Sequence, residues 1–182
     1  MTTPTDTLNQ WLAAEQAVRD AMATGPGAGA GVARPEQLAG KSGLEVMQAL
    51  LRGEIPHATI SATMDFLLLE VDRGRALFQG RPGPQHLNPM GSVHGGWFAT
   101  LLDSALGCAV HTMLPAGSGY TTAELGVNLV KALTPKVARV RAEGRVIHCG
   151  RQLATAEARL VGADGTLYAH ATTTCLVFQM PG

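Results

Sequence analysis

The strongest helical pattern in this 182-residue chain is WFATLLDSALGCAVHTM, residues 97–113. Apolar side chains recur in it at the spacing of one wide helix face, at Phe98, Leu101, Leu102, Ala105, Leu106, Ala109 and Val110. Pro115 and Gly117 stop the pattern. Because so wide an apolar face needs covering on most sides, we expect this helix to be nearly buried.

Strand patterns surround the helix on both sides in sequence. Four β-rich segments follow it without another helix, at residues 121–132, 138–149, 152–161 and 167–179. A hairpin is expected before it, with strands at 64–71 and 75–79 around the turn Asp72-Arg73-Gly74. A short helix is expected to start at the N-cap Ser42. The order predicts an α+β fold, in which one antiparallel sheet is wrapped around a long central helix.

The first 41 residues differ from the rest. Residues 5–22 have a loosely amphipathic pattern that Thr5 or Asp6 could cap as an extra N-terminal helix. The stretch GPGAGAG at 25–31 has the composition of a flexible linker, and no strand precedes it as a dinucleotide-binding glycine motif would require. We therefore divide the chain into residues 1–41, a helix and a Gly/Ala-rich linker, and residues 42–182, one globular domain.

Composition limits the partners of the protein. Hydrophobic residues make up 46% of the chain and charged residues only 15%, so we expect apolar surface to be buried between subunits of a homo-oligomer. The 14 basic residues balance the 14 acidic ones, which argues against nucleic acid or an anionic membrane as a partner. The expected partner is a small molecule.

Cysteine and histidine usage points to a cytoplasmic protein without a metal. Cys108, Cys149 and Cys175 are an odd, widely spaced set, which argues against both a disulfide framework and a zinc site. No two histidines stand four residues apart as helical metal ligands do. The first twelve residues lack the basic start and apolar run of a secretory signal, and no window approaches the ~20 apolar residues of a membrane span.

The run NPMGSVHGGW at 88–97 leads into the buried helix and is the first candidate for chemistry. Gly95 and Gly96 leave backbone N–H groups unshielded at a helix start, where the helix dipole adds partial positive charge. Either amide could polarise an acyl carbonyl as an oxyanion hole does. Asn88, six residues before His94, could bring a side-chain amide to the same place.

Asp103 is the conspicuous charge on the same helix. A carboxylate among apolar neighbours costs free energy unless it is paired or used. Gly95 lies eight residues before it, or about 12 Å at ~1.5 Å per residue, which is too far for both to act on one carbonyl carbon. A symmetric dimer could join the helix start of one protomer to Asp103 of its twin.

These residues resemble hotdog-fold thioesterases of the phenylacetate-degradation (PaaI) and 4-hydroxybenzoyl-CoA type. The shared motif is Asn-Pro-x-Gly-x-x-His-Gly-Gly at 88–96, Asp103 nine residues beyond the histidine, then SALG at 104–107 and YTTAEL at 120–125. The resemblance covers about residues 43–179. It implies an acyl-CoA thioesterase, with an aromatic or medium-chain acyl group and no cofactor beyond the CoA of the substrate.

The resemblance also implies a role for each matching residue. Asp103 of one subunit would be nucleophile or general base, and Gly95 of the other would polarise the thioester carbonyl. Asn88 would place the carbonyl or water, Thr122 would support the carboxylate, and His94 would orient the loop. The implied substrate-binding residues are Gly96, Trp97, Thr121, Gly150, Arg151 and Gln152.

Two departures from the family pattern stand outside this motif. Lys131-Ala132 replaces an Arg-Pro that the family often has, and the N-terminal 40 residues have no counterpart in the minimal fold. Two other functions stay open from the sequence: a non-catalytic acyl-CoA-binding module of the same fold, and a hotdog hydratase or dehydratase.

Overall fold

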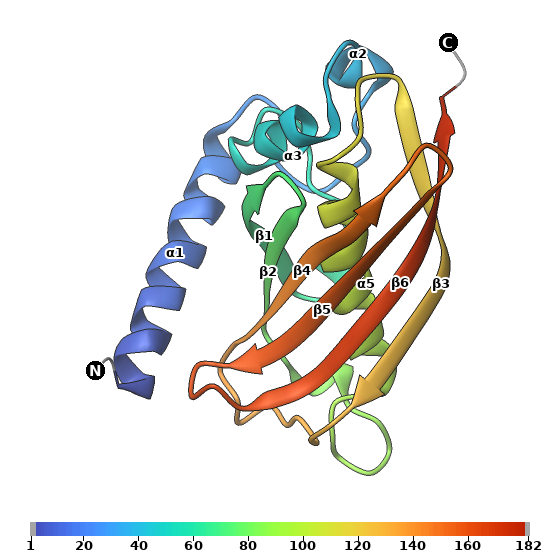
Figure 1. The fold of residues 1–182 in the computed structure, drawn as a ribbon. Coiled ribbons are helices and arrows are strands. Elements are labelled where there is room, and N and C mark those ends of the chain that lie inside the picture. The colour runs from blue at the N-terminus through green and yellow to red at the C-terminus, as the bar shows by residue number, and fades with distance from the viewer. Residues whose placement is uncertain (1–2, 181–182) are drawn as a thin grey trace.

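In residues 3–180, six strands form one antiparallel sheet in the order β1-β2-β4-β5-β6-β3 (Figure 1). The computed structural model describes residues 3–180. The first two residues of the predicted segment 1–41 and the last two of the predicted domain 42–182 lie outside the described part. The strands are β1 Phe66–Asp72, β2 Arg75–Gly80, β3 Ser118–Leu129, β4 Val140–Cys149, β5 Leu153–Gly162 and β6 Leu167–Gln179. The helices are α1 Pro4–Thr24, α2 Pro35–Leu38, α3 Gly43–Leu51, α4 Thr59–Thr63, the 3-10 turn η1 Pro84–His86 and α5 Gly95–His111.

The sheet curves around α5, which confirms the predicted hotdog architecture (Figure 1). Leu101, Leu102 and Leu106 of α5 are fully buried against the inner side of the sheet. Gly144 lets β4 lie close to the backbone of α5, because a Cβ there would lie 2.2 Å from the carbonyl oxygen of Ala105. The helix begins at Gly95, two residues earlier than the apolar pattern indicated, since His94 caps it.

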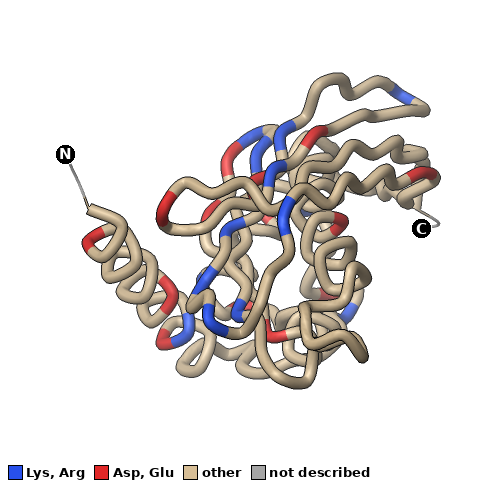
Figure 2. The backbone as a smooth tube through the Cα atoms, turned by 90° about the horizontal axis from the view of Figure 1, so that it is seen from below, with Lys and Arg blue, Asp and Glu red and all other residues tan. Residues whose placement is uncertain are grey.

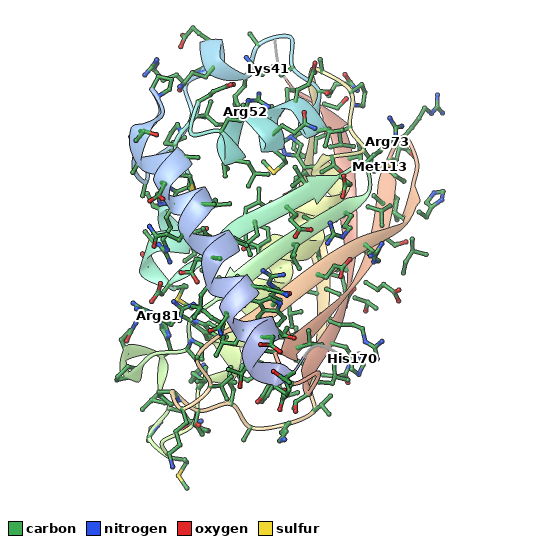
Figure 3. The ribbon with its side chains drawn as sticks, turned by 90° about the vertical axis from the view of Figure 1, so that its left-hand side faces the viewer. Lys41, Arg52, Arg73, Arg81, Met113 and His170 are labelled. Atoms are coloured by element: carbon green, nitrogen blue, oxygen red, sulfur yellow. The ribbon has the colours of Figure 1, made fainter. Side chains whose placement is uncertain are left out.

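The N-terminal helix α1 packs on the opposite face of the sheet. Its Met22 joins Leu67 and Leu69 of β1 in a small apolar cluster separate from the main core. Figure 3 looks onto this face and shows α1 crossing in front of the strands. The sheet is therefore covered on its inner side by α5 and on part of its outer side by α1.

A buried polar network ties α1 to the sheet. Glu15 is 5% exposed, and its carboxylate accepts hydrogen bonds from Arg139 Nε at 2.5 Å and Gln79 Nε2 at 2.7 Å. Arg141 donates to Gln79 Oε1 at 2.8 Å and stacks over the Trp11 ring at 4.5 Å. Because Arg139, Gln79 and Arg141 belong to the β2–β4 side of the sheet, α1 is held in one register on it.

Two expectations for the N-terminal part are wrong in detail. Thr3, and not Thr5 or Asp6, caps α1; Asp6 instead completes a capping box three residues later. The glycine stretch 25–31 is not a free tether, since Gly27 N donates to Gly53 O at 2.8 Å and Gly31 N to His57 O at 2.9 Å. A side chain at Gly27 would collide with the backbone of Ile55, so glycine here permits close packing. The pattern also missed the short α2, α4 and η1.

The edges of the sheet differ in their surroundings. Edge strand β1 lies beside α1, α3 and α4, whereas β3 pairs only with β6 among the described residues. Leu129 and Val130 at the end of β3 are 55% and 54% exposed. A twelve-residue edge without a neighbour offers a row of free backbone groups to another strand.

Charged residues of both signs are interspersed over the described part of the chain, without a large region of one sign (Figure 2). On the outer face of the sheet, Arg75 bonds to both Glu70 and Glu143 at 2.8 and 2.7 Å. None of the helices in residues 3–180 has the length and apolar character required to cross a bilayer.

We expect the Glu15 network to contribute to stability in a pH-dependent way. Burial alone would raise the pKa of Glu15, but the hydrogen bonds from Arg139, Arg19 and Gln79 outweigh it and lower the pKa. The stability is therefore present above the unfolded-state pKa of about 4.3 and is lost as the pH falls through the lower folded-state pKa. Glu15→Gln should lower the free energy of unfolding by about 3 kcal/mol at pH 7, measured by urea unfolding.

The matched control is Glu36→Gln, whose side chain is 78% exposed and whose ion pair with Arg34 should contribute almost nothing. The gap between wild type and Glu15→Gln should narrow as the pH falls below the unfolded-state pKa and close once the pH is below the folded-state pKa of Glu15. A gap that is absent at pH 7, or that persists unchanged in acid, would contradict this account of how α1 is held.

Candidate active site

The start of α5 leaves one backbone donor unused. His94 Nδ1 accepts the N–H of Gly96 at 2.9 Å, and the His94 carbonyl accepts the N–H of Trp97 at 2.9 Å. The N–H of Gly95 has no acceptor within residues 3–180. Of the two amides that the sequence left open as oxyanion donors, Gly95 is thus the free one, and His94 acts as a cap.

Asn88 holds the loop before the helix. Its Oδ1 accepts the N–H groups of Met90 at 2.9 Å and Ser92 at 3.2 Å, and its Nδ2 donates to Ser92 Oγ at 2.9 Å. Because an amide nitrogen carries two hydrogens, one donor of Asn88 is left for another acceptor. The structure therefore gives Asn88 a loop-closing contact that the sequence did not predict, and it leaves a donor free for the expected substrate contact.

Asp103 lies half-buried in the middle of α5 and faces the first half of β3. Its Oδ1 accepts a hydrogen bond from Thr122 Oγ1 at 3.0 Å, as the resemblance implied for this hydroxyl. Its Oδ2 has no hydrogen-bond or ion-pair partner in the described part of the chain. Thr121, by contrast, is exposed and alternates to the other face of the strand. One oxygen of Asp103 is thus fixed and the other is free.

One protomer does not bring Gly95 and Asp103 together. A Cβ at Gly95 would lie 3.1 Å from Leu129, at the end of β3, whereas Asp103 contacts Thr122, seven residues earlier on that strand. Along α5 itself, the eight residues between them span about 12 Å. The two groups occupy separate places on the same side of the molecule.

A cavity of about 240 Å³ opens beside Asp103. Its polar side consists of Asp103, Ser104, Cys108, Tyr120 and Thr122. The rest of its wall comes from α3, residues 57–61, β1 and β2. It is mostly apolar, with Met47, Leu50, Ile60, Leu67, Leu68 and Phe78, and it also includes His57, Ala58 and Ser61. Sequence reasoning missed this wall, because its members are brought to Asp103 only by long-range packing.

A second hollow of about 380 Å³ lies at the glycine turn and includes Gln85, His94, Gly96 and Thr100. Trp97 lines it as well but is only 1% exposed, and its indole N–H donates to the Met64 carbonyl at 2.8 Å. Trp97 is therefore first a core residue that anchors the helix start.

The turn Gly150-Arg151-Gln152 is closed by Gly150 N donating to Leu153 O at 2.8 Å. Arg151 and Gln152 are exposed. Strand register places this turn at the Asp103 end of the sheet, because Cys149 pairs with Ala154, Ala154 with Cys175, and Cys175 with Thr122. The structure thus groups the turn with Asp103 and not with Gly95.

Other candidate nucleophiles near Asp103 are not activated. Burial and the charge of Asp103 raise the pKa of the Cys108 thiol to about 12, so it stays protonated at pH 7. Burial likewise raises the pKa of Tyr120 well above its usual value. No group of three His, Cys, Asp or Glu side chains within residues 3–180 is placed to hold a metal ion. Among the described residues of this site, Asp103 remains the candidate base or nucleophile.

Residues 90–169 match the model of the thioesterase superfamily. No sequence among curated proteins matches the chain. Among solved structures, a putative thioesterase from Ralstonia eutropha JMP134, described as related to phenylacetic acid degradation, is 27% identical with a TM-score of 0.65, over 71% of this chain and 97% of that chain.

Two further structures share the fold. A mutant of the phenylacetic acid degradation protein PaaI from Thermus thermophilus is 26% identical, with a TM-score of 0.58 over 64% of this chain and 96% of that chain. A protein from Streptococcus mutans UA159 bound to acetyl CoA is 22% identical, with a TM-score of 0.58 over 65% of this chain and 92% of that chain. These comparisons confirm the fold that the motif at 88–103 implied, and the match at residues 90–169 is to the superfamily that it resembles.

The capping role of His94 predicts how substitutions there affect stability. His94→Ala removes the acceptor of the Gly96 N–H and should lower the free energy of unfolding by about 1 kcal/mol. His94→Asn supplies another good N-cap acceptor and should restore most of it. Thermal and urea unfolding of both variants measure this; equal losses in the two would argue against a capping role.

Proposed function

We propose that this chain, which has a hotdog fold and matches the thioesterase superfamily over residues 90–169, hydrolyses acyl-CoA thioesters at a site shared by two subunits. The observation that carries the proposal is the N–H of Gly95 at the start of α5, which finds no acceptor within residues 3–180. A buried helix that starts with a free N–H donor, at the positive end of the helix dipole, suits the oxygen of a polarised carbonyl. Asp103, with one free oxygen, supplies the base or nucleophile such a carbonyl needs.

The proposal requires a dimer, since Gly95 and Asp103 of one chain are too far apart to meet on one carbon. The edge of β3 that no described strand pairs with offers the place for a second copy, and Leu129 beside Gly95 is exposed there. Two-fold symmetry would then place each Asp103 beside the partner's helix start and produce two equal sites. The high apolar content of the chain fits this burial, and a dimer of such dimers would bury still more.

In the proposed reaction, the thioester carbonyl accepts the hydrogen bond of Gly95 N–H. In one route, Asp103 takes a proton from a water whose oxygen attacks the carbonyl carbon; the C–S bond breaks, that proton passes to the CoA thiolate, and the acid formed loses its own proton to solvent. In the other route, Asp103 attacks the carbon itself, and the C–S bond breaks as a mixed anhydride forms, with the CoA thiolate taking a proton from solvent. Water then hydrolyses the anhydride, which leaves the product carboxylate and a free Asp103. Thr122 holds Asp103 in the orientation that either route requires.

The remaining residues have supporting parts in this proposal. Asn88 uses its second amide hydrogen on the carbonyl or water, and Gly96 and Trp97 shape the turn. Thr121 and the turn of Gly150, Arg151 and Gln152 meet the CoA moiety, with Arg151 as a phosphate contact. The substrate brings its own CoA, so we propose no separate cofactor, and we expect the enzyme to work in the cytoplasm.

Replacing Asp103 tests the chemistry. Asp103→Asn keeps the size of the side chain but cannot take a proton or attack, so thiol release from acyl-CoAs should fall about 10²–10⁴-fold. Asp20→Asn, on the exposed face of α1, is the matched control and should leave the rate unchanged. Equal thiol release by Asp103→Asn and wild type would overturn the catalytic assignment, and tight binding without release by wild type would favour a binding module.

Gly95 allows its backbone donor to be removed while the helix start is kept. Gly95 is the first residue of α5, a position that proline favours, and His94 has φ −62° and ψ 138°, which suits a residue before proline. Gly95→Pro deletes the N–H and should lower kcat about 10²–10³-fold. Gly95→Ala adds a Cβ but keeps the N–H, so it controls for bulk near Leu129 and should lose far less.

A further inference from the structure

Two cavities of the protomer share one wall. The cavity of about 240 Å³ beside Asp103 and another of about 380 Å³ under α1 are both lined by His57, Ser61 and Leu67. These three side chains form what we call the end wall. Ser61 and Leu67 are 7% and 5% exposed, so they fill the space between the cavities rather than facing solvent.

The first cavity suits an acyl group more than the rest of a CoA ester. Met47, Leu50 and Ile60 supply an apolar side opposite the carboxylate of Asp103. A cavity of about 150 Å³ lined by apolar side chains holds one benzene molecule. On that scale, about 240 Å³ holds a ring with a short side chain or a straight chain of about eight to ten carbons.

The second cavity continues beyond the end wall. It lies between α1 and α4, and its lining includes Met22 and Ala23 of α1 and Phe66 of β1. Arg19 and Asp65 lie at its polar side and pair with each other at 3.6 Å. α1 covers this space, and α3 lines the first cavity, so the N-terminal region supplies walls on both sides of the end wall. This region lies outside the superfamily match at residues 90–169.

His57 is held in the end wall by its backbone. Its N–H donates to Gly29 O at 3.2 Å, and its carbonyl accepts from Gly31 N at 2.9 Å. The ring Nδ1 is buried and has no hydrogen-bond partner in the described part of the chain. Burial and the nearby charge of Arg19 lower the pKa of His57, so the ring is neutral at pH 7. The side chain can therefore be shortened without breaking the two backbone bonds.

We infer that the end wall sets the longest acyl group the site accepts, and that it limits the substrate to acyl groups of ring or medium-chain size. This rests on the proposed thioesterase function and adds a specificity determinant to it. The acyl group enters beside Asp103 and runs between α3 and β1 until it meets His57 and Ser61. Longer chains need the second cavity, which the wall closes off.

The test uses the full-length chain and a panel of phenylacetyl-, octanoyl- and palmitoyl-CoA. Wild type should hydrolyse the first two at least tenfold better, as kcat/KM, than the third. His57→Ala and, separately, Ser61→Gly should join the cavities and raise kcat/KM for palmitoyl-CoA at least tenfold relative to octanoyl-CoA. His170→Ala, an exposed histidine on β6 (Figure 3), is the matched control and should keep the wild-type profile.

Binding of non-hydrolysable acyl-CoA thioethers of the same lengths, measured by calorimetry, separates the two proposals. If wild type hydrolyses thioesters but both wall variants keep its length preference, the end wall inference is overturned while the thioesterase proposal stands. If nothing is hydrolysed but the wall variants shift thioether binding toward the long chain, the wall inference stands and the thioesterase proposal fails.

Discussion

The burial of α5 inside the sheet is the constraint on which the other features depend. A helix covered by β-strands must satisfy its backbone groups at both ends, and His94 does so at the start for Gly96 but not for Gly95. The same burial forces a carboxylate in the helix to face the one side the sheet leaves open. Gly95 and Asp103 therefore share a partly exposed stripe of α5 while remaining about two helical turns apart.

The separation of Gly95 and Asp103 makes the edge of β3 important, because no other strand in residues 3–180 pairs with that edge. The strand runs past both groups, with Thr122 beside Asp103 and Leu129 beside Gly95. A second copy added along this edge would cover the stripe and supply each half-site with what it lacks. Neither the apolar composition nor the free edge of β3 alone requires a dimer. The Gly95 N–H and the second carboxylate oxygen of Asp103, which have no partner in residues 3–180, both fit one.

The sequence predicts the central fold well because its signals are local. The apolar face of α5 and the alternation of four later strands depend on neighbouring residues, and the motif at 88–103 lies in one short stretch. The misses come from contacts between distant segments. Nothing near Gly27 shows that it packs on Ile55, and nothing near Met47 or Ile60 shows that they line the cavity of Asp103. The choice between Gly95 and Gly96 likewise required the ring of His94, whose orientation only the structure gives.

The most direct test of the proposed shared site mixes the two variants that are expected to be inactive. Asp103→Asn and Gly95→Pro are combined in equal amounts under conditions that exchange subunits, with heterodimer formation confirmed by mass spectrometry. In each heterodimer, one site would carry an intact Asp103 and an intact Gly95, so thiol release should recover to about a quarter of wild type. If heterodimers form and release stays at the level of the separate variants, Gly95 and Asp103 do not act together across subunits, and the account is contradicted.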